Sequence, residues 1–122
     1  MDPALVPTEA FEAMVVDALD ALPGWILPIV SEMAVLVEDE QDPSEVEPGL
    51  LRLGVYRGIP RTRGGGRVPG TLPDTITVYR IPILAVCSGV EEVRERVLKV
   101  VGHEVGHAMG LPESRLRELG WH

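Results

Sequence analysis

The stretch VVGHEVGHAMGLPESRLRELG, from Val100 to Gly120, decides the fold and carries the chemistry of this chain. Within it, His103, Glu104 and His107 form an H-E-x-x-H pattern. Four residues are just over one helical turn, so the two imidazoles project from the same side of a helix and can bind one metal ion. Zinc is the usual ion because it accepts nitrogen ligands in tetrahedral geometry. Glu104 lies about 100° further around the helix, where its carboxylate can take a proton from a zinc-bound water.

A long helix around this motif is predicted by an apolar stripe at helical spacing, formed by Val90, Val93, Val97, Val100 and Val101. Ser88 and Glu91 form an S-x-x-E capping box at its start. We expect the helix to run from about Val90 to Met109, with Gly110 in the left-handed conformation that ends it. Gly106 costs the helix roughly 1 kcal/mol relative to alanine. That cost is explained if another group must approach the helix closely at this point.

A catalytic zinc needs a third protein ligand and an open fourth position. Gly110 allows the chain to turn sharply, so that Glu113 can swing back towards the metal. A short final helix is expected after the turn and should end at Gly120. Glu118 and His122 are alternative ligands, reachable if that helix folds back. Glu113 can also be interpreted as an ordinary first-turn acid that interacts with the helix dipole.

The rest of the chain predicts a mixture of helix and strand. Residues 8–22 place their apolar side chains on one face of a helix, which Thr8 can cap. Three strands are expected, at residues 31–40, 50–58 and 75–84, the last broken at Pro82. Residues 59–74 are rich in glycine, proline and arginine and predict a long solvated loop, with a lid over the site as the alternative. The order of elements indicates an α+β fold.

Length and composition indicate a single domain over residues 1–122, with 45% hydrophobic residues to build its core. The net charge of −8 argues against nucleic acid and anionic membranes as partners. Cys87 is the single cysteine, so no disulfide can form within the chain, and a buried apolar role is expected for it. The acidic N-terminal stretch lacks the basic region of a signal peptide, and no apolar run has transmembrane length. These features predict a cytoplasmic protein.

HEVGHAMGLPESRLRELG resembles the C-terminal signature of small bacterial zincin-like proteins with a matrix-metalloprotease-like domain. Four further blocks agree in the same order, so the resemblance covers Phe11 to Gly120: FEAMVVDALDALP, AVLVEDE, LGVYRGIP and PDTITVYRIPIL. The resemblance implies a minimal zincin fold, in which a small mixed sheet packs against an active-site helix. It also implies zinc on His103 and His107, Glu104 as the base and Glu113 as an acidic third ligand.

In zincins a substrate peptide commonly pairs with an edge strand close to the metal, and the resemblance makes Thr75 to Tyr79 the candidate. Tyr79, or alternatively Tyr56, could donate a hydrogen bond to the oxyanion that forms on the substrate. The alternatives are an ordinary sheet strand and tyrosines that pack with their hydroxyls at the surface.

Three functions follow from these observations. The first is a zinc-dependent metallopeptidase, in which a zinc-bound water activated by Glu104 hydrolyses a peptide or protein substrate. The second is a non-catalytic, metal-stabilised interaction module, because no methionine follows Glu113 to form the methionine turn of metzincins. The third is a metal-dependent nuclease, which the acidic charge disfavours.

Overall fold

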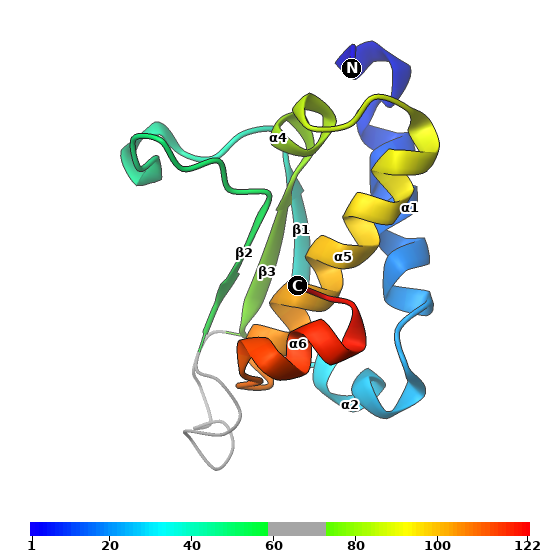
Figure 1. The fold of residues 1–122 in the computed structure, drawn as a ribbon, viewed down its shortest axis with the longest axis vertical. Coiled ribbons are helices and arrows are strands. Elements are labelled where there is room, and N and C mark those ends of the chain that lie inside the picture. Colours follow the sequence, from blue (N-terminus) through cyan, green and yellow to red (C-terminus); the bar gives the residue numbers. More distant parts are fainter. Residues whose placement is uncertain (59–72) are drawn as a thin grey trace.

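A computed structural model describes residues 1–58 and 73–122, and shows a three-stranded sheet with helices packed against it (Figure 1). The strands are β1 (Ala34–Glu38), β2 (Gly54–Arg57) and β3 (Thr75–Tyr79), in the spatial order β1-β3-β2. β1 pairs with β3 in parallel, and β2 pairs with β3 antiparallel. The predicted α+β fold with a small mixed sheet is therefore confirmed.

β3 is the central strand of this sheet, which corrects the prediction that Thr75 to Tyr79 form the edge strand for a substrate. Its backbone is hydrogen-bonded to a neighbour on each side, so no further strand can be added to it. Its residues from Ile76 to Tyr79 are all buried. The outer strands of the three are β1 and β2.

The predicted third strand is also too long at its C-terminal end. β3 stops at Tyr79, and the chain continues directly into the short helix α4 (Arg80–Ala85). Pro82 lies in the first turn of α4, where its missing N–H group has no helical partner to lose. The proline that indicated a break in a strand therefore stands at the start of a helix.

Helix α5 (Val90–Ala108) packs against β2 and β3 and also against α1 (Thr8–Asp20) (Figure 1). The predicted span of α5 is confirmed to within one residue. Four of the five predicted stripe valines, Val93, Val97, Val100 and Val101, are buried in the hydrophobic core, as is Val105, whereas Val90 at the start of the helix is 40% exposed.

The predicted capping box at the start of α5 names the wrong acidic residue: the partner of Ser88 is Glu92 and not Glu91. Gly89 is the N-cap residue, so Ser88 precedes the cap, and Glu91 pairs with Arg94 instead. Glu92, the third residue of the helix, accepts hydrogen bonds from the Ser88 backbone N–H at 3.1 Å and the Ser88 hydroxyl at 2.8 Å. Ser88 and Glu92 therefore fasten the first turn of α5 to the segment before it.

The remaining elements are short. Helix α6 (Glu113–Leu119) follows α5 and ends at Gly120, as predicted, and the φ of Gly120 is 78°, in the left-handed region. The others are α2 (Leu27–Val30) and the 3-10 turns η1 (Pro3–Leu5), η2 (Gly24–Ile26) and η3 (Pro43–Glu45). Among the described helices none alone has the length and hydropathy to span a membrane; α1 with Gly24–Val30 reaches them only as a pair bent by 99°.

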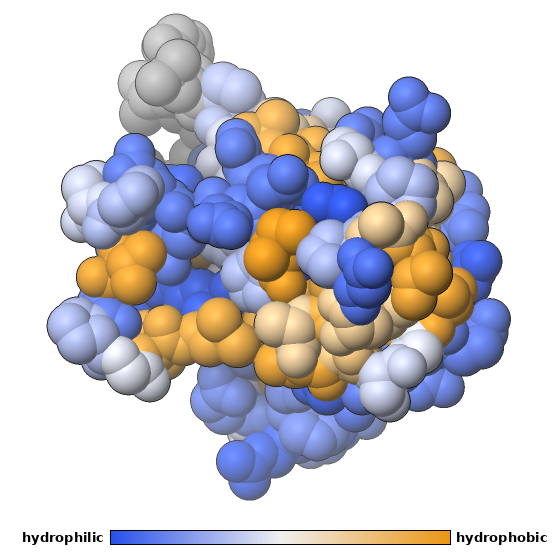
Figure 2. Space-filling view, turned by 90° about the horizontal axis from the view of Figure 1, so that it is seen from above, coloured by the Kyte–Doolittle hydropathy of each residue, from blue (hydrophilic) through white to orange (hydrophobic). Residues whose placement is uncertain are grey.

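The end of the molecule seen in Figure 2 shows a band of adjoining apolar side chains across its lower centre and right side, with smaller apolar groups elsewhere among hydrophilic side chains. The large exposed hydrophobic residues come from many segments of the described chain, among them Leu5, Trp25, Val46, Leu51 and Val86. Exposed apolar side chains are common on a folded domain, and by themselves they identify no binding surface.

Candidate metal centre

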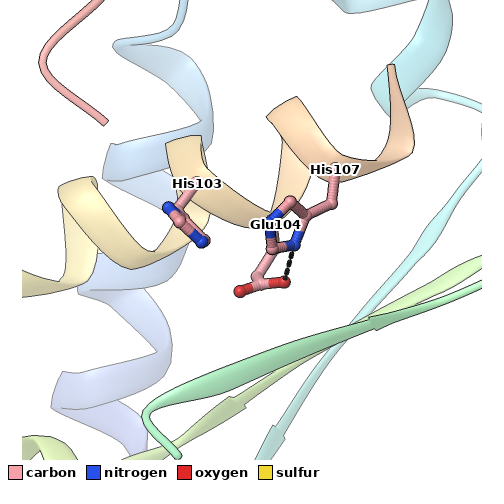
Figure 3. A group of neighbouring side chains, drawn as sticks. All are labelled: His103, Glu104 and His107. Atoms are coloured by element: carbon pink, nitrogen blue, oxygen red, sulfur yellow. Dashed lines mark hydrogen bonds and ion pairs between the residues drawn. The ribbon is translucent and has the colours of Figure 1, made fainter. Parts of the chain in front are cut away.

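His103, Glu104 and His107 lie together on the side of α5 that faces the sheet (Figure 3). The two imidazole rings have their centroids 4.3 Å apart and are inclined at 72°. One potential ligand atom from each of the three residues lies within 4.8 Å of the others. All three residues line one pocket of about 360 Å³, which is bordered by β2 on the opposite side.

Both histidines are held through the Nδ1 atom of the ring. Nδ1 of His103 lies 2.8 Å from the backbone carbonyl oxygen of Trp121, and Nδ1 of His107 lies 2.9 Å from Oε1 of Glu104. Both partners are acceptors, so in each hydrogen bond Nδ1 carries the proton and Nε2 of the neutral ring keeps its lone pair. Metal-binding histidines in proteins are oriented in this way. The donor set therefore fits a zinc ion bound by two Nε2 atoms.

Glu104 is fixed by its surroundings, with only 7% of its surface exposed. Oε1 accepts a hydrogen bond from the backbone N–H of Tyr56 in β2, at 3.1 Å, in addition to the one from His107. Oε2 has no hydrogen-bond partner among the described residues. No fully buried side-chain oxygen of the described residues lacks such a partner, so Oε2 is not fully buried. Oε2 therefore touches the pocket, where it can accept a proton.

Two glycines of α5 allow the C-terminal segment to pack against the helix behind the histidines. A Cβ atom on Gly102 would lie 2.6 Å from the indole of Trp121, and one on Gly106 would lie 2.1 Å from Leu116. Leu116 is fully buried and Trp121 is 7% exposed. The expectation that another group approaches α5 at Gly106 is confirmed, and the same packing brings the Trp121 carbonyl oxygen to His103.

The predicted turn after α5 is present, since Gly110 has a φ of 71°. Glu113 is exposed at the first position of α6 and does not belong to the group of His103, Glu104 and His107. Its role as third ligand stays a prediction. Glu118 pairs with Arg115, with 2.8 Å between Oε2 and a guanidinium nitrogen. His122, the other alternative, lines the pocket.

Tyr79 is on the wrong face of the sheet for the predicted oxyanion contact. A Cβ atom on Gly54 would point at Val100 of α5, and Gly54 pairs with Val78, so Val78 also faces α5. Side chains alternate along a strand, so Tyr79 faces the other way. It is 3% exposed and does not line the pocket, so the structure does not support it as an oxyanion donor.

Tyr56 lies on the correct face and lines the pocket, but its hydroxyl donates to Oδ2 of Asp74 at 2.7 Å. Its contribution to the site is its backbone N–H group. Cys87 is buried and outside the group of ligands, and burial raises the pKa of its thiol, as expected for a packing residue. Arg61, Arg63 and Arg67 of the predicted loop lie outside the described residues.

Three cationic residues in the pocket were not predicted: Arg52, which precedes β2, and Arg96 and Lys99 of α5. The helical spacing from Arg96 through Lys99 to His103 could have indicated that the two cations share a face with the first histidine. Arg52 joins them only through the packing of β2 on α5, which no local pattern encodes.

A small mixed sheet, covered by a helix that presents two histidines and a glutamate to one pocket, defines a zincin-type domain. A family model described as zincin-like metallopeptidase matches residues 30–121, and the chain belongs to this family. The resemblance found in the sequence is thereby confirmed. Among solved structures, a conserved hypothetical protein from Thermo thermophilus is similar, with a TM-score of 0.59 and 23% identity over 93% of this chain and 97% of that chain. This similarity shows the fold. No curated protein matches the sequence.

Proposed function

We propose that the protein is a zinc-dependent metallopeptidase in which His103 and His107 hold the metal and Glu104 is the general base. One observation carries the proposal: His103, His107 and the anchored carboxylate of Glu104 line the same pocket, and the hydrogen bonds at Nδ1 of both histidines leave their Nε2 atoms to bind a metal. Membership of a metallopeptidase family supports it.

The metal and the side chains of the site have different roles in the proposed reaction. A bound zinc ion supplies Lewis acidity, which makes a water molecule more acidic and polarises a carbonyl group. Oε2 of Glu104 accepts the proton of the attacking water and returns it to the departing amine. The hydrogen bonds from Tyr56 and His107 to Oε1 prevent the carboxylate from rotating away, so the base is already in place before a substrate arrives.

We place the peptide along β2. Among the described residues this strand pairs with β3 on one side only, and Leu53, Gly54, Val55 and Tyr56 line the pocket. The N–H of Tyr56 is already bonded to Glu104, so an extended peptide would pair with the remaining free backbone groups of this strand, and the scissile carbonyl would then lie over the two histidines.

The proposal is tested with Glu104→Gln, which keeps the shape of the side chain and removes its basicity. Zinc content should stay near that of the unaltered protein, while cleavage of an internally quenched peptide library should fall by about 10²–10⁴-fold. His107→Ala, in contrast, should lose both zinc and cleavage. Unchanged cleavage by Glu104→Gln would refute the assigned role of Glu104.

A second function, a non-catalytic metal-stabilised module, is favoured by the contact between His103 and Trp121, because it links a metal ligand to the packing of the C-terminal segment. Metal would then serve mainly to stabilise the fold. This function predicts a lower Tm on chelation, with no cleavage of any peptide in the library.

A further inference from the structure

The pocket forms a groove between β2 and α5, and the two elements run in the same direction. Gly54 of β2 lies against Val100 of α5. The next such contact is the hydrogen bond from the Tyr56 N–H to Glu104, which lies two residues further along the strand and four residues further along the helix. Two strand residues and four helical residues both advance by about 6 Å. The same step taken backwards places Arg52 opposite Arg96.

The groove therefore has a cationic end, formed by Arg52, Arg96 and Lys99, all of which line the pocket. Glu104 is the one acid among the described lining residues, and it lies at the histidine end. Nearby acids neutralise the cations only weakly. Glu47 is 3.9 Å from Arg52 with both side chains well exposed, and Glu92 interacts with Arg96 while it accepts hydrogen bonds from Ser88.

Lys99 makes no hydrogen bond or ion pair with any described residue. In a chain with a net charge of −8, three cations gathered in the pocket of the candidate metal centre run against the overall charge. Clefts lined by one sign of charge concentrate ligands of the opposite sign.

We infer that the groove selects acidic substrates: peptides that place a carboxylate at the cationic end while the scissile bond lies at the histidines. This inference rests on the proposed peptidase function and adds the substrate class to it. Lys99 precedes His103 by one helical turn and Arg96 by two, or about 6 and 10 Å. An extended peptide advances about 3.3 Å per residue, so the carboxylate belongs two or three residues from the cleaved bond.

The first experiment measures kcat/KM on matched quenched peptides that carry Glu, Gln or Lys at the second or third residue on either side of one scissile bond. Each peptide is made with a free and an amidated C-terminus, because a side-chain and a terminal carboxylate offer the same chemistry. We expect the preferred Glu peptide to exceed its Gln counterpart by roughly tenfold. A tenfold advantage found only for the free C-terminus would assign the groove to the terminal carboxylate.

Lys99→Gln and Arg96→Gln should each reduce that preference several-fold, and Lys99→Glu should favour the Lys peptide. Arg94→Gln is the matched control, because Arg94 lies on α5, pairs with Glu91 and does not line the pocket. It should leave the preference unchanged. Equal kcat/KM for the Glu, Gln and Lys peptides would overturn the inference.

Binding separates this inference from the proposed function. Fluorescence anisotropy with zinc-loaded Glu104→Gln measures the affinity of labelled Glu and Gln peptides without turnover. If the Glu peptide binds more tightly than the Gln peptide, and Lys99→Gln abolishes this difference, the groove selects acidic peptides. This result would hold even if the unaltered protein cleaves no peptide, in which case only the peptidase function is refuted. Equal affinities, or preferential binding of a single-stranded RNA over every peptide, would overturn the inference.

Discussion

Nδ1 of His103 donates a hydrogen bond to the backbone carbonyl oxygen of Trp121, 2.8 Å away and 18 residues later in the chain. The indole of the same tryptophan packs on Gly102, the residue directly before the histidine. The orientation of a candidate metal ligand is therefore set by the packing of the C-terminal segment.

Gly102→Ala tests this dependence. The added methyl group would lie 2.6 Å from the indole, so Trp121 must shift, and we expect the shift to weaken the hydrogen bond from His103 to its carbonyl oxygen. Overpacking costs about 1–3 kcal/mol, which the better helix propensity of alanine offsets by about 1 kcal/mol. Loss of a hydrogen bond that orients a ligand weakens metal binding by about 10–100-fold. We expect a lower Tm and weaker zinc binding in a competition titration with a chelating dye.

The control is Gly24→Ala, because a Cβ atom at Gly24 meets no atom within 4 Å. It should leave zinc affinity unchanged. Unaltered zinc affinity in Gly102→Ala would show that Trp121 does not orient His103.

Zinc affinities of Glu113→Gln and His122→Gln will identify the third ligand. Two imidazoles contribute no charge, so a carboxylate ligand adds the attraction that a dication needs. Glu113 has no hydrogen bond or ion pair with the described residues that would hold its side chain away from the metal. We expect Glu113→Gln to weaken zinc binding by about 10-fold or more. His122→Gln should have the smaller effect; the reverse order would assign the ligand to His122.

Chelation should lower the Tm of the zinc-loaded protein. Zinc at about 100 times its Kd stabilises the folded state by about 2.7 kcal/mol, which corresponds to roughly 10 °C for a domain of this size. Differential scanning calorimetry with and without chelator measures the shift. The double variant His103→Ala/His107→Ala should show the same Tm in both conditions, and a shift that persisted in it would place the metal elsewhere.

The contact between Ser88 and Glu92 predicts a pH dependence of stability. The two hydrogen bonds from Ser88, first the backbone N–H and then the hydroxyl, hold the pKa of the Glu92 carboxyl below its ordinary value. A group with a lowered folded pKa stabilises the protein above its unfolded pKa and loses that contribution as the pH falls through the folded pKa. The Tm advantage over Glu92→Gln should therefore be present at neutral pH, begin to decline near the ordinary glutamate pKa of about 4.3, and be lost as the pH falls through the lower folded pKa.

Glu95→Gln is the control for this pH experiment, because Glu95 lies exposed on the same helix without a hydrogen bond or ion pair to the described residues. Its difference in Tm from the unaltered protein should be small at every pH. A Tm advantage for Glu92 that persisted into acid would contradict the proposed role of its charge.

The metal-binding helix could be predicted from the sequence because its signals are local. The valine stripe fixed the span of α5, and Gly110 and Gly120 both adopt the left-handed conformation expected where a helix ends. The H-E-x-x-H spacing placed both imidazoles on one side of the helix for the same reason.

The arrangement of the sheet could not be predicted in the same way. The β-branched run that ends at Tyr79 indicates a strand, but its place between β1 and β2 depends on pairing with residues far away in the sequence. The exclusion of Tyr79 from the site and the position of Arg52 beside α5 both follow from that pairing. An N-cap at Gly89 instead of Ser88 likewise exchanged Glu91 for Glu92 as the partner of Ser88.

A cationic groove on a strongly anionic molecule makes capture and retention of an acidic peptide respond to salt in opposite directions. At long range the peptide is repelled by the net charge of −8, whereas at contact it is attracted by Arg52, Arg96 and Lys99. Added salt screens both effects, with a Debye length of about 8 Å at physiological ionic strength. Rising salt therefore increases the association rate of the acidic peptide and also increases its dissociation rate. The ionic strength at which binding is strongest therefore depends on the charge of the peptide.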